Sequence, residues 1–140
     1  MLVDAKNVTV HIGEPETVKG KGLKQSYTVY TITTLPYNWV VRRRYSDFEW
    51  FLKCLEKRFP AHYVSLNGNS FQIPELPPKS LQKTNPDNVQ LRLHSFSKFL
   101  DVILSSSELT YSPELIPFLS YDDVAFAKSQ KVFFLVVCNF

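Results

Sequence analysis

Hydrophobic and polar residues alternate along the first third of the chain, which is the pattern of strands that bury one face. The pattern predicts a first strand at residues 8–12 and a second, rich in β-branched and aromatic residues, at residues 26–34. A turn at residues 35–38 leads to a third strand at residues 39–44. Residues 13–24 are predicted to be a loop. The short connections favour an antiparallel meander of three strands.

The spacing of apolar residues changes from two to three and four directly after the third strand, which predicts an amphipathic helix. Its apolar positions are Phe48, Phe51, Leu52, Leu55 and Phe59. Ser46 is expected to cap this helix, with Glu49 completing a capping box. Pro60 is expected to end it.

A second helix is expected to begin at Asn85, a favourable capping residue, with Pro86 in its first turn. Its apolar stripe comprises Val89, Leu93, Phe96, Phe99, Leu100 and Ile103. A short helix should follow from Ser112-Pro113 to Leu119. Because the strands precede the helices, we predict an α+β domain in which a three-stranded antiparallel sheet packs against a helical subdomain. A length of 140 residues suits one such domain.

A long, proline-rich loop is expected between the two main helices, at residues 61–88. It contains a turn signal at residues 67–69 and the segment 73–79, in which three prolines favour an extended chain that ends at Lys79. From the residues alone, this segment is a stiff connector, a ligand for an SH3-like partner, or a support for Lys79.

The chain carries a mild excess of positive charge, with 16 Lys and Arg against 13 Asp and Glu, which suits an anionic partner. Gly20-Lys21-Gly22-Leu23-Lys24 lacks the spacing of a phosphate-binding Walker loop. The distinctive basic residues are few, which disfavours nucleic acid, since its binders spread charge over a broad face. The spacing of the three histidines suggests no metal site, and we expect no catalytic residue and no cofactor.

Two cysteines make no disulfide framework, and the N-terminus lacks the apolar core of a signal peptide, so a cytoplasmic protein is predicted. Residues 132–140 are strongly apolar but too few to span a bilayer. We interpret residues 127–140 as an apolar tail left by truncation. Pairing as a strand or attachment to a partner remains an alternative.

Arg92 falls on the apolar stripe of the second predicted helix, close in direction to Phe96 and Phe99. A buried guanidinium requires an anion or hydrogen-bond acceptors. Either Arg92 binds an anionic ligand, or it reaches water or pairs with a structural carboxylate such as Asp47 or Glu75.

The junction between the third strand and the first helix, Arg43-Arg44-Tyr45-Ser46-Asp47-Phe48, resembles the signature of the phox-homology (PX) domain, above all as sorting nexins carry it. The resemblance covers about residues 4–126. It implies that Arg44 grips the 3-phosphate of phosphatidylinositol 3-phosphate and that Tyr45 packs against the inositol ring. Strand alternation places Arg43 on the opposite face, so Arg42 and Arg43 are assigned to structure or general electrostatics.

The resemblance implies two further head-group contacts. Lys79, at the end of Leu76-Pro77-Pro78-Lys79, should meet the 1-phosphate, and Arg92 should hold the 4- and 5-hydroxyls. In the loop that follows the proline-rich segment, Leu81 and Lys83 are the expected membrane contacts. The implied role is peripheral attachment to endosomal membranes in protein transport, with protein partners in a sorting complex. The alternative is a protein-interaction module of the same fold in which lipid binding is secondary.

Overall fold

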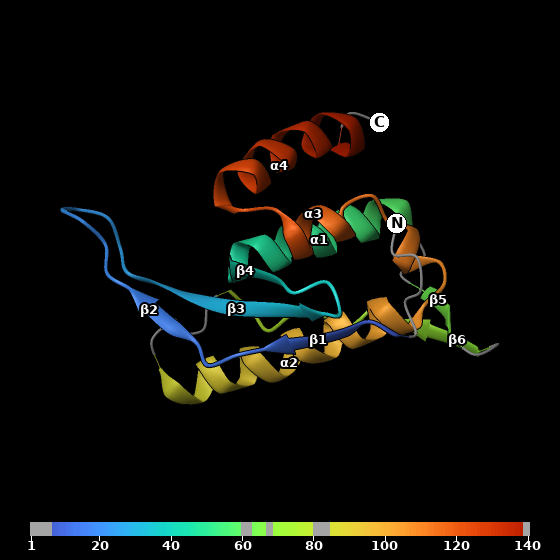
Figure 1. The fold of residues 1–140 in the computed structure, drawn as a ribbon, viewed down its shortest axis with the longest axis horizontal. Coiled ribbons are helices and arrows are strands. Elements are labelled where there is room, and N and C mark those ends of the chain that lie inside the picture. The colour runs from blue at the N-terminus through green and yellow to red at the C-terminus, as the bar shows by residue number, and fades with distance from the viewer. Residues whose placement is uncertain (1–6, 60–62, 67–68, 80–84, 139–140) are drawn as a thin grey trace.

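A four-stranded antiparallel sheet forms one side of the molecule (Figure 1). The computed structural model describes residues 7–59, 63–66, 69–79 and 85–138. The strands are β1 (Thr9–Ile12), β2 (Glu16–Val18), β3 (Tyr27–Leu35) and β4 (Trp39–Arg44). β3 lies in the centre, with β1 and β2 paired to successive parts of one edge and β4 to the other.

The prediction of three strands was wrong by one, because β2 lies in the segment predicted as a loop. With three residues, two of them polar, β2 is too short to show alternation. Its pairing with β3, from Glu16 opposite Val29 to Val18 opposite Tyr27, is what makes it a strand. The long segment after the first helix also contains a hairpin of β5 (Tyr63–Leu66) and β6 (Asn69–Gln72). The turn expected there lies partly outside the described residues.

The helices cover the sheet and each other (Figure 1). They are α1 (Tyr45–Arg58), α2 (Pro86–Ser105), α3 (Leu115–Ser120) and α4 (Asp123–Cys138), with a 3₁₀ helix at Leu109–Tyr111. Asn85 caps α2 as predicted, since its side-chain oxygen accepts from the Asp87 backbone N–H at 2.9 Å. α3 begins at Leu115, later than the Ser112-Pro113 start that we predicted, and the 3₁₀ helix occupies the residues just before Ser112.

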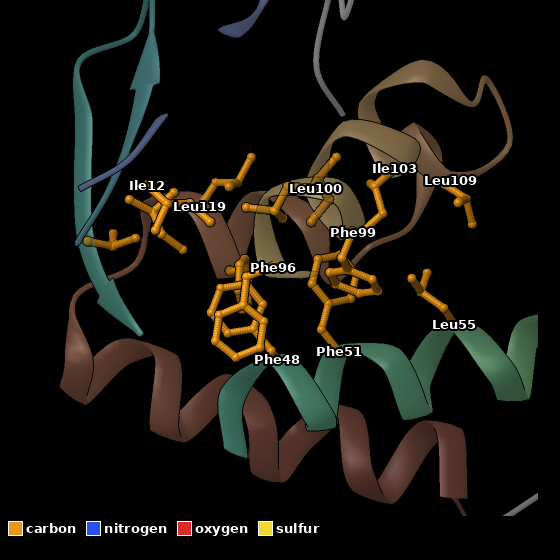
Figure 2. Close-up of a cluster of buried hydrophobic side chains, with 14 of the residues drawn as sticks. Ile12, Phe48, Phe51, Leu55, Phe96, Phe99, Leu100, Ile103, Leu109 and Leu119 are labelled. Atoms are coloured by element: carbon orange, nitrogen blue, oxygen red, sulfur yellow. The ribbon is translucent and has the colours of Figure 1, made fainter. Parts of the chain in front are cut away.

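The hydrophobic core lies where the apolar stripes of α1 and α2 meet, as Figure 2 shows. The rings of Phe48 and Phe96 stack with centroids 3.8 Å apart and planes 3° apart. Phe51 meets Phe99 edge-on, with centroids 5.7 Å apart. The predicted stripes are confirmed at their centres, where Phe48, Phe51, Leu55, Phe96, Phe99, Leu100 and Ile103 are all buried. These contacts fix the positions of the two helices that bound the candidate site.

α1 starts two residues earlier than predicted, because β4 runs into it without a linker. Arg44 is the capping residue and Ser46 lies inside the first turn. The acceptor at the helix start is the Asp47 carboxylate, whose Oδ2 accepts from the Arg44 backbone N–H at 2.9 Å. The predicted capping box between Ser46 and Glu49 is therefore wrong. A carboxylate in the first turn also suits the positive end of the helix dipole.

Arg43 is 1% exposed and ties β4 to the end of α3. Its Nε donates to the Phe118 carbonyl at 2.8 Å, and its Nη2 donates to the carbonyls of Pro117, at 3.2 Å, and Tyr121. Its Cζ lies 3.9 Å from the ring centre of Phe126. The structural role predicted for Arg43 is confirmed. Burial lowers the pKa of Arg43 to about 10, so the guanidinium stays charged at neutral pH.

α4 lies across α1 on the side away from α2 (Figure 1). Trp50 meets Phe126 and Phe133, with ring centroids 5.3 and 6.1 Å away. Gln130 Nε2 donates to Asp47 Oδ1 at 3.2 Å. The boundary expected after residue 126 falls inside this helix, and no strand forms at residues 127–138. Within the described part of the chain, no helix is both long enough and apolar enough to cross a membrane.

Candidate functional site

A hollow of about 480 Å³, open to solvent, lies where β4 passes into α1. The proline-rich segment and α2 contribute the other walls. All four residues predicted to bind a head group line it, and its full lining is Tyr27, Thr28, Arg44, Tyr45, Ser46, Lys79 and Arg92. The guanidiniums of Arg44 and Arg92 therefore share one site, although they come from different elements.

Arg44 is the last residue of β4, and its side chain is exposed beside the first residue of β3. Its Cζ lies 4.2 Å from the ring centre of Tyr27. The register explains this contact: Arg44 is opposite Val29, so Tyr27 is its diagonal neighbour on the same face. Stacking on an aromatic face orients a guanidinium while leaving its N–H groups available to a ligand.

Tyr45 connects the start of α1 to the proline-rich segment, because its hydroxyl donates to the carbonyl of Pro77. Burial raises the pKa of Tyr45, the charge of Glu49 adds to this effect, and the positive charge of Arg92 opposes it. The hydroxyl is therefore protonated at neutral pH. This hydrogen bond holds the ring in the wall of the hollow.

Arg92 is 3% exposed, and its Cζ lies 4.5 Å from the ring centre of Tyr45. Its side chain therefore packs inside the site instead of extending into bulk water, which was one of the two alternatives. The same guanidinium acts on Tyr30, whose pKa is raised by burial and lowered in part by the charge of Arg92. Two arginine–tyrosine pairs, Arg44 on Tyr27 and Arg92 on Tyr45, thus contribute to the lining of the hollow.

Lys79 is exposed and follows Pro77 and Pro78, of which Pro77 is buried. The proline-rich segment therefore does more than connect two helices, since it places the Lys79 side chain in the lining of the hollow. Leu81 and Lys83, the expected membrane contacts, lie outside the described residues.

The lining of the hollow has three cationic side chains and no carboxylate. Asp47, the nearest acidic residue in the sequence, is engaged with the Arg44 backbone and Gln130. Burial raises the pKa of Asp47, and its hydrogen bonds and the two neighbouring arginines oppose the rise. In the part of the chain that the structure describes, no three potential metal ligands gather. The arrangement suits a compact anion that also offers an apolar face to Tyr45.

Three lining residues were not predicted from the sequence, namely Tyr27, Thr28 and Ser46. Tyr27 lay at the start of a predicted strand, and nothing in the local pattern distinguishes it from a core residue. The signal that finds it is the pairing of β3 with β4, which sets Tyr27 beside Arg44. Ser46 was assigned to the helix cap.

An α+β domain with a small, cationic, aromatic-lined hollow at a strand–helix junction is an anion-binding module. The profile of the PX domain matches residues 33–122. This match covers more than half of the chain, and the chain therefore belongs to the PX domain family.

The relatives include sorting nexins. Sorting nexin-30 of Mus musculus is 30% identical over an alignment 142 positions long, gaps included, which covers 92% of this chain and 30% of that protein. Sorting nexin MVP1 of Candida glabrata is 36% identical over 90 residues, 63% of this chain and 16% of that protein. The chain thus spans less than a third of the length of either relative.

Solved structures show the same fold. A designed CISK-PX domain, determined by X-ray methods, aligns with a TM-score of 0.62 and 30% identity, over 79% of this chain and 97% of its own. The cryo-EM structure of the SNX-BAR Mvp1 tetramer aligns with a TM-score of 0.68 and 23% identity, over 91% of this chain and 34% of its own. The family and the fold are thus those of a PX domain, and the two relatives named above are sorting nexins.

Proposed function

We propose that the hollow binds phosphatidylinositol 3-phosphate and so attaches the protein to the surface of endosomal membranes during protein transport. The observation that carries the proposal is the convergence of Arg44, Tyr45, Lys79 and Arg92 on one hollow. These residues come from a strand end, a helix start, an extended segment and a second helix. Each has the chemistry that one part of the head group requires.

Arg44 binds the 3-phosphate. Its planar guanidinium offers two parallel N–H groups to two phosphate oxygens, which an ammonium group does not reproduce. The ring of Tyr27, 4.2 Å from Cζ, and the helix start behind it limit the orientations that this fork adopts. An arginine held in this way loses little conformational entropy on binding.

Arg92 and Tyr45 contact the inositol ring and determine which of its positions carry a phosphate. The buried guanidinium of Arg92 donates to the 4- and 5-hydroxyls, and additional phosphates at these positions would need space that the packed Arg92–Tyr45 pair occupies. Tyr45 presents its face to the C–H side of the inositol ring. Lys79 neutralises the 1-phosphate, for which a point charge is sufficient.

The test is the binding of the protein to liposomes that each contain one of the phosphoinositides, at two salt concentrations. We expect the strongest binding to phosphatidylinositol 3-phosphate. Arg44→Ala should weaken it by roughly 2–5 kcal/mol, because the phosphate then loses its charged partner. Arg44→Lys should also bind poorly, and equal affinity would mean that charge alone matters.

Arg42→Ala is the matched control, since it removes the same charge two residues away. Arg42 is exposed, pairs with Glu16 at 3.5 Å and is absent from the lining of the hollow. Binding that falls equally in the Arg42 and Arg44 variants would indicate non-specific electrostatic attraction. Unchanged liposome binding by a folded Arg44→Ala variant would instead favour the protein-interaction role.

A further inference from the structure

Tyr30, in the middle of β3, has a buried hydroxyl that the packing of the core does not require. The residue is 1% exposed, and its hydroxyl has no hydrogen-bond partner among the described residues. Burying a hydroxyl without a partner is unfavourable, and a phenylalanine would fill the same space without that cost. Packing alone therefore does not account for a tyrosine at this position.

The register of β3 places Tyr30 directly behind the head-group hollow. Side chains two positions apart on a strand face the same side, and Thr28, which lines the hollow, precedes Tyr30 by two positions. Tyr30 itself is not part of the lining. Any effect of its hydroxyl on a bound ligand must therefore pass through a residue that does line the hollow.

Arg92 is the lining residue that adjoins Tyr30. The Tyr30 ring meets Phe96 edge-on, with centroids 5.0 Å apart, and Arg92 lies one helical turn before Phe96 on the same face of α2. The charge of Arg92 lowers the pKa of Tyr30 against the effect of burial, which is consistent with this proximity. The guanidinium of Arg92 thus lies near two tyrosines, since it also packs on the ring of Tyr45.

We propose that Tyr30 is a positioning residue of the head-group hollow. When Arg92 donates to the hydroxyls of a bound inositol ring, another N–H of the same guanidinium donates to the Tyr30 hydroxyl oxygen and fixes the orientation of the planar group. A guanidinium carries enough N–H groups to serve the ligand and the tyrosine together. The unfavourable burial of the hydroxyl in the free protein is then relieved on binding. This role rests on the proposed function of the hollow, because it requires Arg92 to contact the ligand.

The test is calorimetric titration of Tyr30→Phe with soluble inositol 1,3-bisphosphate. The substitution removes the hydroxyl and keeps the ring against Phe96. We expect the affinity to fall about ten-fold, because the variant loses a hydrogen bond to a charged group that forms only in the complex. Tyr37→Phe is the matched control, since it removes the same group from a tyrosine that is 38% exposed and does not line the hollow. It should leave the affinity unchanged.

Urea unfolding of the free protein separates a positioning role from a structural one. Tyr30→Phe should be at least as stable as the wild type, because it removes a buried group that has no partner among the described residues. Lower stability of Tyr30→Phe would mean that the hydroxyl supports the fold itself, and would overturn the proposal.

Combination with Arg92→Met tests whether the effect passes through the guanidinium. Methionine keeps an apolar stem at this position and removes every N–H donor of the side chain. In this background Tyr30→Phe should cause no further loss of affinity, and an undiminished loss would show that the hydroxyl acts by another route.

The same titrations distinguish failure of this role from failure of the hollow. If Arg92→Met binds weakly while Tyr30→Phe binds as tightly as Tyr37→Phe, the role of Tyr30 is refuted and the proposed function of the hollow stands. If the wild-type protein does not bind inositol 1,3-bisphosphate, the proposed function is refuted and the role of Tyr30 with it.

Discussion

Replacement of Arg43 should destabilise the fold without removing the lipid site, although Arg43 adjoins Arg44 in sequence. Arg43 donates to three carbonyls at the end of α3, those of Pro117, Phe118 and Tyr121. Hydrogen bonds to a charged donor contribute about 2 kcal/mol each, or roughly 6 kcal/mol together. Removing the side chain would also take this donor from the Phe118 and Tyr121 carbonyls, while the Pro117 carbonyl would keep the Tyr121 N–H at 3.1 Å.

The cost of burying the charge partly offsets this stabilisation. The pKa of Arg43 falls from 12.5 to about 10 because burial outweighs the attraction of Asp47, Asp123 and Asp122, so the folded state disfavours the charged form by a net cost of roughly 3 kcal/mol, which Arg43→Ala relieves. We therefore expect a net loss of about 3 kcal/mol in the free energy of unfolding. For a chain of this length, such a loss lowers the midpoint of thermal unfolding by roughly 10 °C.

The assay is urea unfolding of Arg43→Ala and Arg42→Ala, followed by titration of both folded variants with inositol 1,3-bisphosphate. Arg42 is exposed with a single ion pair, so its loss should change stability by no more than about 0.5 kcal/mol. Arg43→Ala should retain head-group affinity, because Arg43 does not line the hollow. If Arg43→Ala proves as stable as Arg42→Ala, the inferred support of α3 by this guanidinium is wrong.

Three further outcomes are expected. Deletion after Lys131 should leave lipid binding intact and reduce aggregation, because the hollow is lined by residues 27–92; lost binding would place the end of α4 in the site. Tyr27→Ala should weaken head-group binding several-fold in titration calorimetry, since a cation–π contact contributes about 1 kcal/mol, and unchanged affinity would mean that Arg44 needs no aromatic support. Because burial raises the pKa of Asp47, its stabilising contribution is full at acidic pH and is lost as pH rises through the folded-state pKa. Asp47→Asn should therefore gain stability relative to the wild type as pH rises from about 4 to about 7 in urea unfolding; the reverse trend would mean that its hydrogen bonds outweigh burial.

Sequence patterns alone placed the main elements, and the resemblance to the PX signature pointed to the four candidate ligand residues. Both kinds of signal are local in the sequence. The spacing of Phe48, Phe51 and Leu55 predicts a helix, and strand alternation separates Arg43 from Arg44. Both features survive in the structure, where Arg43 is buried and Arg44 lines the hollow.

The features that sequence missed depend on contacts between distant segments. β2 is a strand only because β3 offers it hydrogen bonds, and Tyr27 belongs to the site only through its register with Arg44. The start of α1 was misplaced because the pattern showed a serine where a cap is preferred. Because β4 passes directly into the helix, Arg44 is instead the capping residue, and the Asp47 carboxylate accepts from its backbone N–H.

The pairing of β3 with β4 has a consequence for mutations far from the hollow. Tyr30 lies opposite Arg43 and Val29 opposite Arg44, so a slip of one position would turn each arginine to the other face. The guanidinium that supports α3 would then face the hollow, and the guanidinium that now lines the hollow would point into the interior. An insertion or deletion in the turn at residues 36–38 that shifted this register would therefore exchange the positions of the Arg43 and Arg44 side chains, although neither residue would be mutated.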